Sequence, residues 1–236
     1  MKKGEQKLPI YRAQKPHTAD EIAADAKKRV SLINKEFSEG FELIRKYPKS
    51  VTVFGSSVLP ETDPYYAKTR ELAAKISKLG YTVVTGGGAG IMEAANRGAF
   101  EAGGKSIGLN IKLPHEQNPN PYLTDYHQFH YFFSRKVALT FAAEAYLFFP
   151  GGYGTLNELS EIIMLIQTQR IKPVPVILFG DGFWEQFDQF IKENLLKRHM
   201  IDAEDLTIYK ICGSDEEVID ILRSLPVVSS VPFKND

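Results

Sequence analysis

The sequence predicts an α/β protein built on a Rossmann-like, doubly wound parallel sheet with helices on both faces and an extra N-terminal helix. From residue 51 onward, short and almost wholly apolar runs alternate with segments of helix length, as they do when parallel strands are buried on both faces. Glycine-rich turns follow three of these runs. The 236 residues, 43% of them hydrophobic, are enough for one large domain.

The N-terminal segment, residues 1–48, is expected to be a tail followed by an amphipathic helix. Thr18 starts a T-x-x-E capping box with Glu21. Behind this box, apolar residues recur every three or four positions up to Pro48, which predicts one long helix. Its apolar stripe is expected to lie on the core or on a second subunit, and a coiled-coil seam is the alternative. Residues 49–236 then form a single Rossmann-like domain.

Five runs of this domain are expected to be strands, because each is short, rich in β-branched or aromatic residues and followed by a turn. They are VTVFG (51–55), YTVVTGG (81–87), KSIGLNI (105–111), AYLFFP (145–150) and PVPVILFG (173–180). Between the third and the fourth run come the excursion PHEQNPNPYL and the aromatic segment QFHYFF.

Helices are expected to connect the strands as right-handed crossovers. The predicted helices are residues 64–79, 90–102, one from Ser134, one after the loop at 150–154, one that contains Trp184, and 214–225. The last of these forms a C-terminal tail together with LTIYKI. Trp184 and Cys212 are expected to pack in the core, and Lys27-Lys28-Arg29 is expected on a solvated helix face.

Composition and charge exclude several classes of function. The 29 basic and 29 acidic residues cancel, so no nucleic-acid partner is expected. A single cysteine permits no intrachain disulfide, which fits a cytoplasmic protein, and the N-terminus has no apolar leader. No apolar run reaches the roughly 20 residues that cross a membrane. His127 and His130 lie close together without a third ligand at a metal-binding spacing, so no metal site is expected.

Small residues at the ends of three strands indicate where a ligand is held. Glycine lets a backbone approach a ligand closely, and the first N–H groups of the following helix are unpaired and favour anions. A phosphate group is therefore the expected ligand, although each loop taken alone is also compatible with a tight turn. The three loops are Gly55-Ser56-Ser57, Gly86-Gly87-Gly88-Ala89-Gly90 and Gly151-Gly152-Tyr153-Gly154-Thr155.

Two absent motifs narrow the kind of phosphate ligand. There is no G-x-x-x-x-G-K-[ST] string, so ATP hydrolysis of the P-loop type is not expected. The dinucleotide fingerprint G-x-G-x-x-G also fails, because Ile91 or Asn157 stands where its third glycine would be. A mononucleotide, bound without a cofactor, remains the candidate.

Three charged residues lie where they can face such a ligand. Glu158 comes about one turn into the helix after the third loop, and Glu93 holds a similar place after the second. Glu158 is either a site carboxylate or an acid that the helix dipole favours. Arg135, at the start of another helix, is either a bidentate partner for an anion or carboxylate, or a surface arginine.

Three motifs, in this order, resemble those of a known family. They are GGGAGIMEA (86–94), Ser-Arg-Lys (134–136) and PGGYGTLNE (150–158), which is similar to PGGxGTxxE. The family is the "lonely guy" (LOG) family of cytokinin riboside 5′-monophosphate phosphoribohydrolases, formerly named lysine decarboxylases. The resemblance covers about residues 51–195, and the extra N-terminal helix is similar to that of longer bacterial members.

The resemblance implies hydrolysis of the N-glycosidic bond of AMP or an N6-prenylated AMP to free base and ribose 5-phosphate. It implies that Arg135 and Glu158 are catalytic, with Glu158 stabilising an oxocarbenium-like transition state while the glycine loops hold the 5′-phosphate. The family often has an acid where this chain has Asn157, which bears on base or sugar preference. With the loops, the expected substrate-binding residues are Gly55, Ser56, Gly87, Gly88, Glu93, Lys136, Gly151, Gly152, Tyr153, Gly154, Thr155 and Asn157.

Other functions stay open on the same fold. They are a non-catalytic nucleotide sensor, a carrier of a phosphorylated cofactor such as a molybdopterin, and a pyridoxal-phosphate lysine decarboxylase, for which no lysine stands out. The resemblance also implies a homodimer with its site near the subunit boundary, and longer members assemble further. Met92, Met164 and the aromatic residues of 129–133 are candidate walls for a prenyl pocket.

Overall fold

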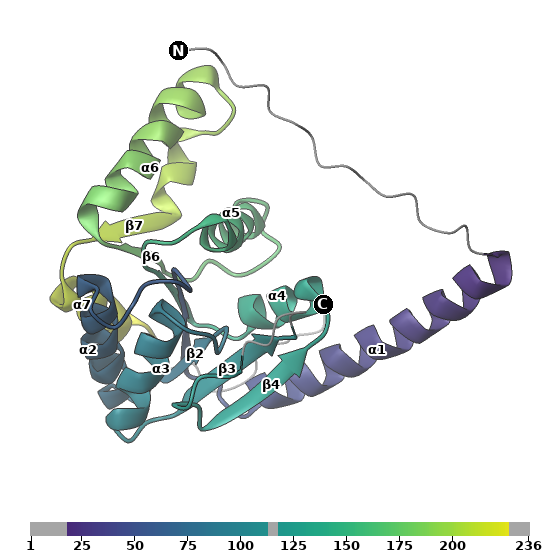
Figure 1. The fold of residues 1–236 in the computed structure, drawn as a ribbon. Coiled ribbons are helices and arrows are strands. Elements are labelled where there is room, and N and C mark those ends of the chain that lie inside the picture. Colours follow the sequence, from purple (N-terminus) through teal and green to yellow (C-terminus); the bar gives the residue numbers. More distant parts are fainter. Residues whose placement is uncertain (1–17, 113–117, 227–236) are drawn as a thin grey trace, which may run out of the picture.

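The computed structural model describes residues 18–112 and 118–226, and within these ranges the predicted α/β fold is confirmed. Seven parallel strands form one sheet in the order β4-β3-β2-β1-β5-β6-β7 (Figure 1). The strands are β1 (Ser50–Phe54), β2 (Thr82–Thr85), β3 (Ser106–Ile111), β4 (Asp125–Phe129), β5 (Ala145–Phe148), β6 (Val176–Phe179) and β7 (Tyr209–Cys212).

Helices alternate with the strands along most of the chain, as the apolar pattern predicts, but β4 follows β3 with no helix between them in the described residues. The helices are α1 (Ala19–Arg45), α2 (Pro64–Lys78), α3 (Ile91–Glu101), α4 (Phe132–Phe141), α5 (Tyr153–Gln167), α6 (Asp181–Asn194) and α7 (Asp215–Ser224), with two short 3₁₀ helices, η1 (Leu196–Arg198) and η2 (Ala203–Thr207).

The order of the strands reverses at β1, which pairs with β2 on one side and β5 on the other. The chain builds the sheet outward from β1 to β4 and then returns through α4 to β5. Ligands of such sheets bind outside the carboxyl ends of the strands at this point of reversal. Phe54 pairs with Phe148, so the loops after β1 and β5 leave the sheet side by side.

Two apolar clusters cover the two faces of the sheet. One contains side chains of α2, α3 and α7, and the other contains side chains of α1, α4, α5 and α6. Figure 1 shows α2, α3 and α7 grouped on one side of the strands. Cys212 lies in the first cluster and Trp184 in the second, both fully buried, which confirms that they are core residues.

Two parts of the sequence prediction need correction. α4 begins at Phe132 rather than at Ser134, so the aromatic segment is divided between β4 and α4. The expected C-terminal tail is an integral part of the domain, because β7 pairs with β6 and α7 packs on the core. The spacing within a short apolar run predicts a strand but does not show which neighbour it pairs with.

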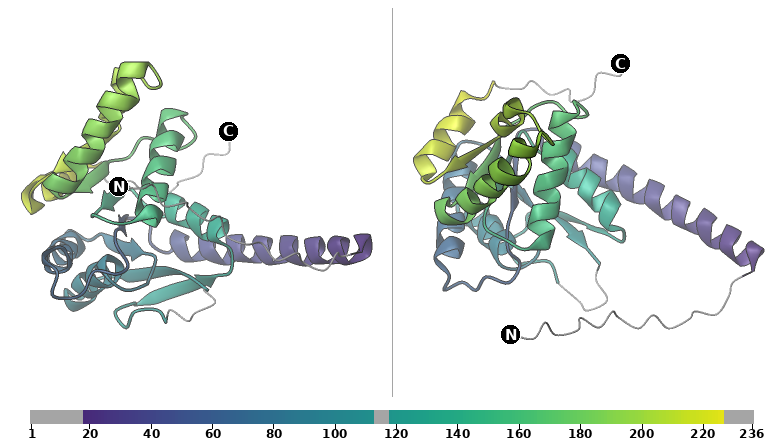
Figure 2. Two further views of the ribbon diagram at one scale, coloured as in Figure 1. Left: turned by 45° about the horizontal axis from the view of Figure 1, so that its top comes forward. Right: turned by 90° about the horizontal axis from the view of Figure 1, so that it is seen from above.

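α1 begins at the predicted capping box, in which Thr18 and Glu21 each accept a hydrogen bond from the other's backbone N–H. Its C-terminal half lies on α4 and β4, with Leu43 in the core. Its N-terminal half extends away from the body of the protein (Figures 1 and 2). Residues 18–31 are all exposed, including Lys27-Lys28-Arg29, so the apolar stripe lies on the core only in the second half of the helix.

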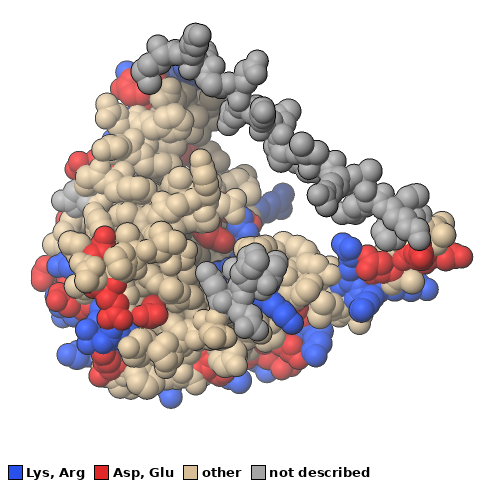
Figure 3. Space-filling model, in the orientation of Figure 1, with Lys and Arg blue, Asp and Glu red and all other residues tan. Residues whose placement is uncertain are grey.

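Charges of both signs are interspersed on the face drawn in Figure 3, along α1 and around α2 and α3. This distribution follows from the equal numbers of acidic and basic residues. Within residues 18–112 and 118–226, no helix combines the length and the apolar character that a membrane span requires.

Candidate active site

The three glycine loops meet at the point where the strand order reverses. The backbone N–H of Ser56 donates to the carbonyl of Pro150 at 3.0 Å, and the N–H of Ile91 donates to the carbonyl of Ser56 at 2.9 Å. Gly90 has φ +66°, and a Cβ there would lie 2.4 Å from the Ser56 carbonyl oxygen. Glycine is therefore required at this position, because it permits both the backbone angle and the close approach. The loops after β1, β2 and β5 thus form one continuous surface.

Asparagine side chains outside the predicted set shape the loop after β2. The carbonyl of Gly87 accepts from the Asn110 amide at 3.2 Å and from the Asn120 backbone N–H at 2.9 Å. The carbonyl of Gly88 accepts from the Asn120 amide at 3.0 Å. Because the C=O and N–H of a trans peptide point in opposite directions, the N–H groups of Gly88 and Ala89 point away from these asparagines.

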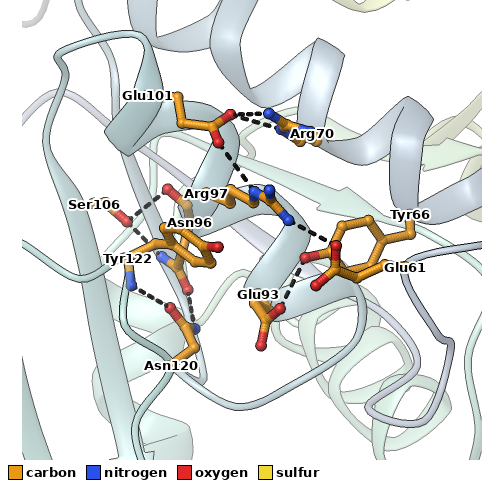
Figure 4. Close-up of polar contacts among 10 residues, drawn as sticks. All are labelled: Glu61, Tyr66, Arg70, Glu93, Asn96, Arg97, Glu101, Ser106, Asn120 and Tyr122. Atoms are coloured by element: carbon orange, nitrogen blue, oxygen red, sulfur yellow. Dashed lines mark hydrogen bonds and ion pairs between the residues drawn. The ribbon is translucent and has the colours of Figure 1, made fainter.

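Asn96 holds Asn120 in place from α3 (Figure 4). Its side-chain oxygen accepts from the Asn120 amide at 2.9 Å and from the Thr85 hydroxyl at 2.6 Å, and its own amide donates to the Ser106 hydroxyl at 2.8 Å. Sequence reasoning missed this network. The available signal was an asparagine inside an otherwise apolar helix face or strand, since a buried amide is kept only where its hydrogen bonds are satisfied.

The loop after β5 leads into a helix start that lacks a side-chain cap. Gly152 is the N-cap of α5 and supplies no side-chain acceptor for the first N–H groups of the helix. A Cβ on Gly152 or Gly154 would meet nothing within 4 Å among the described atoms, so these glycines leave open space beside the backbone. Thr155 is buried with its hydroxyl against Gly151, whereas the Tyr153 side chain is 92% exposed. This helix start has the features of an anion site.

Arg135 is partly buried at the site and is not a surface arginine. Its Nε donates to the carbonyl of Leu109 at 2.8 Å. Its guanidinium lies against the second glycine loop, because a Cβ on Gly86 would come within 2.2 Å of one Nη atom. Burial lowers the pKa of Arg135, and the negative charge of Glu158 opposes this shift. The two residues expected to be catalytic therefore interact electrostatically.

Glu158 is also partly buried, in the second turn of α5. Burial raises its pKa, while the positive charges of Lys136 and Arg135 oppose the shift. An acid kept only for the helix dipole would be exposed in the first turn. A carboxylate with a raised pKa beside an arginine is the pattern of a functional group.

Lys136, on α4, contacts two residues of α5 and acts electrostatically on Glu158. Its Nζ donates to the Asn157 side-chain oxygen at 2.8 Å and forms an ion pair with Glu161. The structure thus pairs two predicted binding residues, Lys136 and Asn157, with each other. Asn157, which departs from the family pattern, is therefore a direct hydrogen-bond partner of Lys136.

Glu93 is oriented by Tyr66, a residue of α2 that sequence reasoning missed. The Tyr66 hydroxyl donates to one carboxylate oxygen of Glu93 at 2.8 Å. Burial, more than any other cause, raises the pKa of Tyr66 to about 12, so the hydroxyl keeps its proton at neutral pH. In Figure 4 the other oxygen of Glu93 points away from Tyr66 and contacts none of the other residues drawn.

Two of the histidines, His127 and His130, pack against aromatic rings. His127 lies edge-on to Phe129, and His130 lies edge-on to Tyr131. In the part of the chain that the structure describes, no group of three or more His, Cys, Asp or Glu side chains could hold a metal ion.

Curated proteins that are similar to this chain include two with the same activity in their names. The rice protein named "Cytokinin riboside 5′-monophosphate phosphoribohydrolase LOG" is 30% identical over 151 residues, which are 61% of this chain and 60% of the relative. The "Cytokinin riboside 5′-monophosphate phosphoribohydrolase" of Rhodococcoides fascians is 28% identical over 186 residues, 76% of this chain and 92% of the relative. The match to the rice protein therefore spans less than two thirds of its length.

Solved structures share the fold. The X-ray structure of TM1055 superimposes with a TM-score of 0.57 at 29% identity, covering 75% of this chain and 99% of TM1055. The molybdenum cofactor carrier protein of Chlamydomonas reinhardtii has the same TM-score at 18% identity, covering 74% of this chain and 96% of the carrier, a likeness of fold alone.

The family model described as "Possible lysine decarboxylase" matches residues 92–222. This range holds Glu93, α4 with Arg135 and Lys136, and α5 with Glu158. It is more than half of the 236 residues, so the chain belongs to this family, whose curated relatives carry the name cytokinin riboside 5′-monophosphate phosphoribohydrolase, the LOG family.

Proposed function

We propose that the chain hydrolyses the N-glycosidic bond of purine nucleoside 5′-monophosphates, AMP or N6-prenylated AMP, to free base and ribose 5-phosphate. The observation that carries this proposal is the partly buried carboxylate of Glu158 beside Arg135, one turn beyond an uncapped helix start at the reversal of strand order. The activity in the names of the relatives supports the same reaction.

The 5′-phosphate is held by the start of α5. The N–H groups that follow Gly152 have no side-chain cap, and the helix dipole favours a doubly negative group there. The loop after β1 borders this site, because the backbone N–H of Ser56 donates to the carbonyl of Pro150. Phosphate binding fixes the ribose relative to Glu158, so that binding energy is used for positioning.

Cleavage then takes place at C1′ of the ribose. The C1′–N9 bond breaks, its electron pair leaves with the base, and the base takes up a proton from solvent. Positive charge develops on the sugar, and the Glu158 carboxylate stabilises it. The oxygen of a water molecule bonds to C1′ as Glu158 accepts a proton from that water. The positive charge of Arg135 helps to keep the Glu158 carboxylate ionised, and the Glu93 oxygen that Tyr66 does not bind accepts from a ribose hydroxyl.

The family description names a different activity, and the site supports it less well. A pyridoxal-phosphate decarboxylase needs a lysine whose neutral amine forms a Schiff base. Lys136 is the lysine at this site, and it is engaged by the carboxylate of Glu161 and the amide oxygen of Asn157. These contacts suit a lysine that positions neighbouring groups.

The direct test is to incubate the purified protein with AMP and with isopentenyl-AMP, without added cofactor, and to follow free base by chromatography. We expect base release from at least one nucleotide, and the ratio of kcat/KM values names the preferred one. Calorimetric binding of both nucleotides without any base release would overturn the proposal and favour the sensor or carrier function.

We propose further that the chain works as a homodimer or a larger homo-oligomer. Apolar side chains of α4 and α5 are exposed next to Lys136, among them Phe133 at 48% and Met164 at 46%. The extended half of α1 also exposes Ile22 and Val30, and an isolated helix of this kind is only marginally stable in water. Light scattering after size-exclusion chromatography is expected to give at least twice the mass of 26.5 kDa. A monomer at micromolar concentration would contradict this expectation.

A further inference from the structure

Glu36, in the middle of α1, is a buried carboxylate at 3% exposure. It lies about 100 residues before the groups that it contacts. Its oxygens accept hydrogen bonds from the backbone N–H groups of His130 and Tyr131, the latter at 3.3 Å, and from the hydroxyl of Ser134. His130 immediately precedes α4, Tyr131 is its N-cap residue and Ser134 lies in its first turn, so Glu36 ties α1 to the start of this helix.

α4 needs a cap from elsewhere because its own sequence lacks one. Tyr131 is its N-cap and makes no side-chain cap bond, and the first turn contains no acid. The helix also carries Arg135 and Lys136 near its N-terminus, where the dipole disfavours positive charge. Glu36 brings a carboxylate to this helix start and accepts from the backbone N–H of the N-cap residue Tyr131, as the acid of a capping box does.

The packing of α1 brings Glu36 to this place. Gly40 lies one turn further along the helix and is buried, and a Cβ there would lie 2.8 Å from the ring of Phe129. The glycine therefore lets α1 approach the end of β4 closely, directly before α4 begins. α1 lies outside residues 92–222, the region matched by the family model.

We propose that Glu36 is a positioning residue for Arg135, a role that rests on the catalytic function proposed for Arg135. By holding the turn into α4, Glu36 fixes the helix start from which the Arg135 guanidinium reaches the Leu109 carbonyl and interacts electrostatically with Glu158. α1 then has a role beyond packing, because its Glu36 carboxylate fixes the start of α4 and thereby the position of Arg135.

The test compares Glu36→Ala with Asp215→Ala. Asp215 is a matched control, since it is a buried carboxylate at the start of α7, bonded to Lys75 at 2.8 Å and on the opposite face of the sheet. Both variants lose a buried acid at a helix start. We expect Glu36→Ala to lower kcat for the nucleotide by about 10- to 100-fold, as small displacements of catalytic groups do, with Asp215→Ala close to wild type.

Two further readouts separate positioning from general loss of stability. In an Arg135→Lys background, Glu36→Ala is expected to cause little further loss of kcat, because both changes act on one group. Hydrogen exchange of the amides at 130–136 is expected to be faster in Glu36→Ala and unchanged in Asp215→Ala. Glu36→Gln, which keeps one acceptor oxygen, is expected to lie between wild type and Glu36→Ala and serves if the alanine variant does not fold.

Equal kcat in wild type and both Glu36 variants, or unchanged exchange at 130–136, would overturn the role of Glu36. If the wild-type protein releases no base, the proposed function fails by itself. Exchange at the start of α4 then still decides whether Glu36 holds this helix, because it is measured without any substrate.

Discussion

Glu158→Gln is expected to lower kcat for base release by about 10³-fold or more, while nucleotide affinity changes by less than about tenfold. The amide keeps the size of the side chain but can neither stabilise a positive charge at C1′ nor accept a proton from water. The 5′-phosphate still binds at the start of α5, which does not involve this side chain. The rate is measured by single-turnover base release, and the affinity by calorimetry.

Glu161→Gln is the matched control for this result. Glu161 is the next acid on α5, undergoes the same change and contacts Lys136, which keeps its hydrogen bond to Asn157. We expect a loss of less than about tenfold in this variant. A Glu158→Gln protein that binds the nucleotide normally and keeps full activity would show that Glu158 is not catalytic.

The raised pKa of Glu158 predicts where kcat/KM falls at acid pH. Burial raises the pKa of Glu158 above its ordinary value of 4.5, with Lys136 and Arg135 opposing the shift. Catalysis needs the ionised carboxylate, so kcat/KM is high above this pKa and falls as the pH drops through it. The limb is therefore expected at a pH above 4.5. A limb that persists in Glu158→Gln would belong to another group.

Arg135→Lys is expected to lower kcat/KM by about 10²- to 10³-fold, although it keeps the charge. The guanidinium has separate donors for separate partners, and Nε is already bonded to the Leu109 carbonyl at 2.8 Å. A single ammonium group cannot keep this bond and also hold Glu158, since its donors radiate from one atom. Single-turnover rates and calorimetric affinities, measured in parallel, show which step is lost.

Arg70→Lys provides the comparison for Arg135. Arg70 also makes an ion pair, with Glu101, but its side chain is 42% exposed and lies on α2, away from the glycine loops. Its replacement is expected to leave kcat/KM within about threefold of wild type, as surface ion pairs contribute little. Equal losses in the two variants would mean that Arg135 has only a structural role.

Much of the fold follows from local patterns. The five predicted strands between 51 and 180 and most of the helices are visible as apolar runs, glycine turns and capping boxes, because these features depend on neighbours along the chain. β4, with the sequence DYHQF, has no such apolar pattern and is missing from the prediction. The capping box of Thr18 and Glu21 is a clear case, since both partners lie within four residues. The glycine loops are visible for the same reason.

Contacts between residues far apart in the sequence cannot be predicted from local patterns. Asn120 supports Gly88 from 32 positions away, and Tyr66 holds Glu93 across two helices. The spacing of these residues along the chain does not predict these contacts. The local pattern likewise assigns β7 to a C-terminal tail, because its position at the edge of the sheet depends on pairing with β6.

Local patterns are enough to predict the class of fold, the three glycine loops and the candidates Arg135 and Glu158, because periodicity and short motifs depend on neighbouring residues. The folded structure is needed to show that Arg135 and Glu158 are both partly buried, that Lys136 pairs with Asn157 and Glu161, and that Glu36 binds the start of α4. The physical reason is packing: burial and hydrogen-bond partners arise where distant elements meet, and α1 meets α4 only because the sheet brings β4 beneath both.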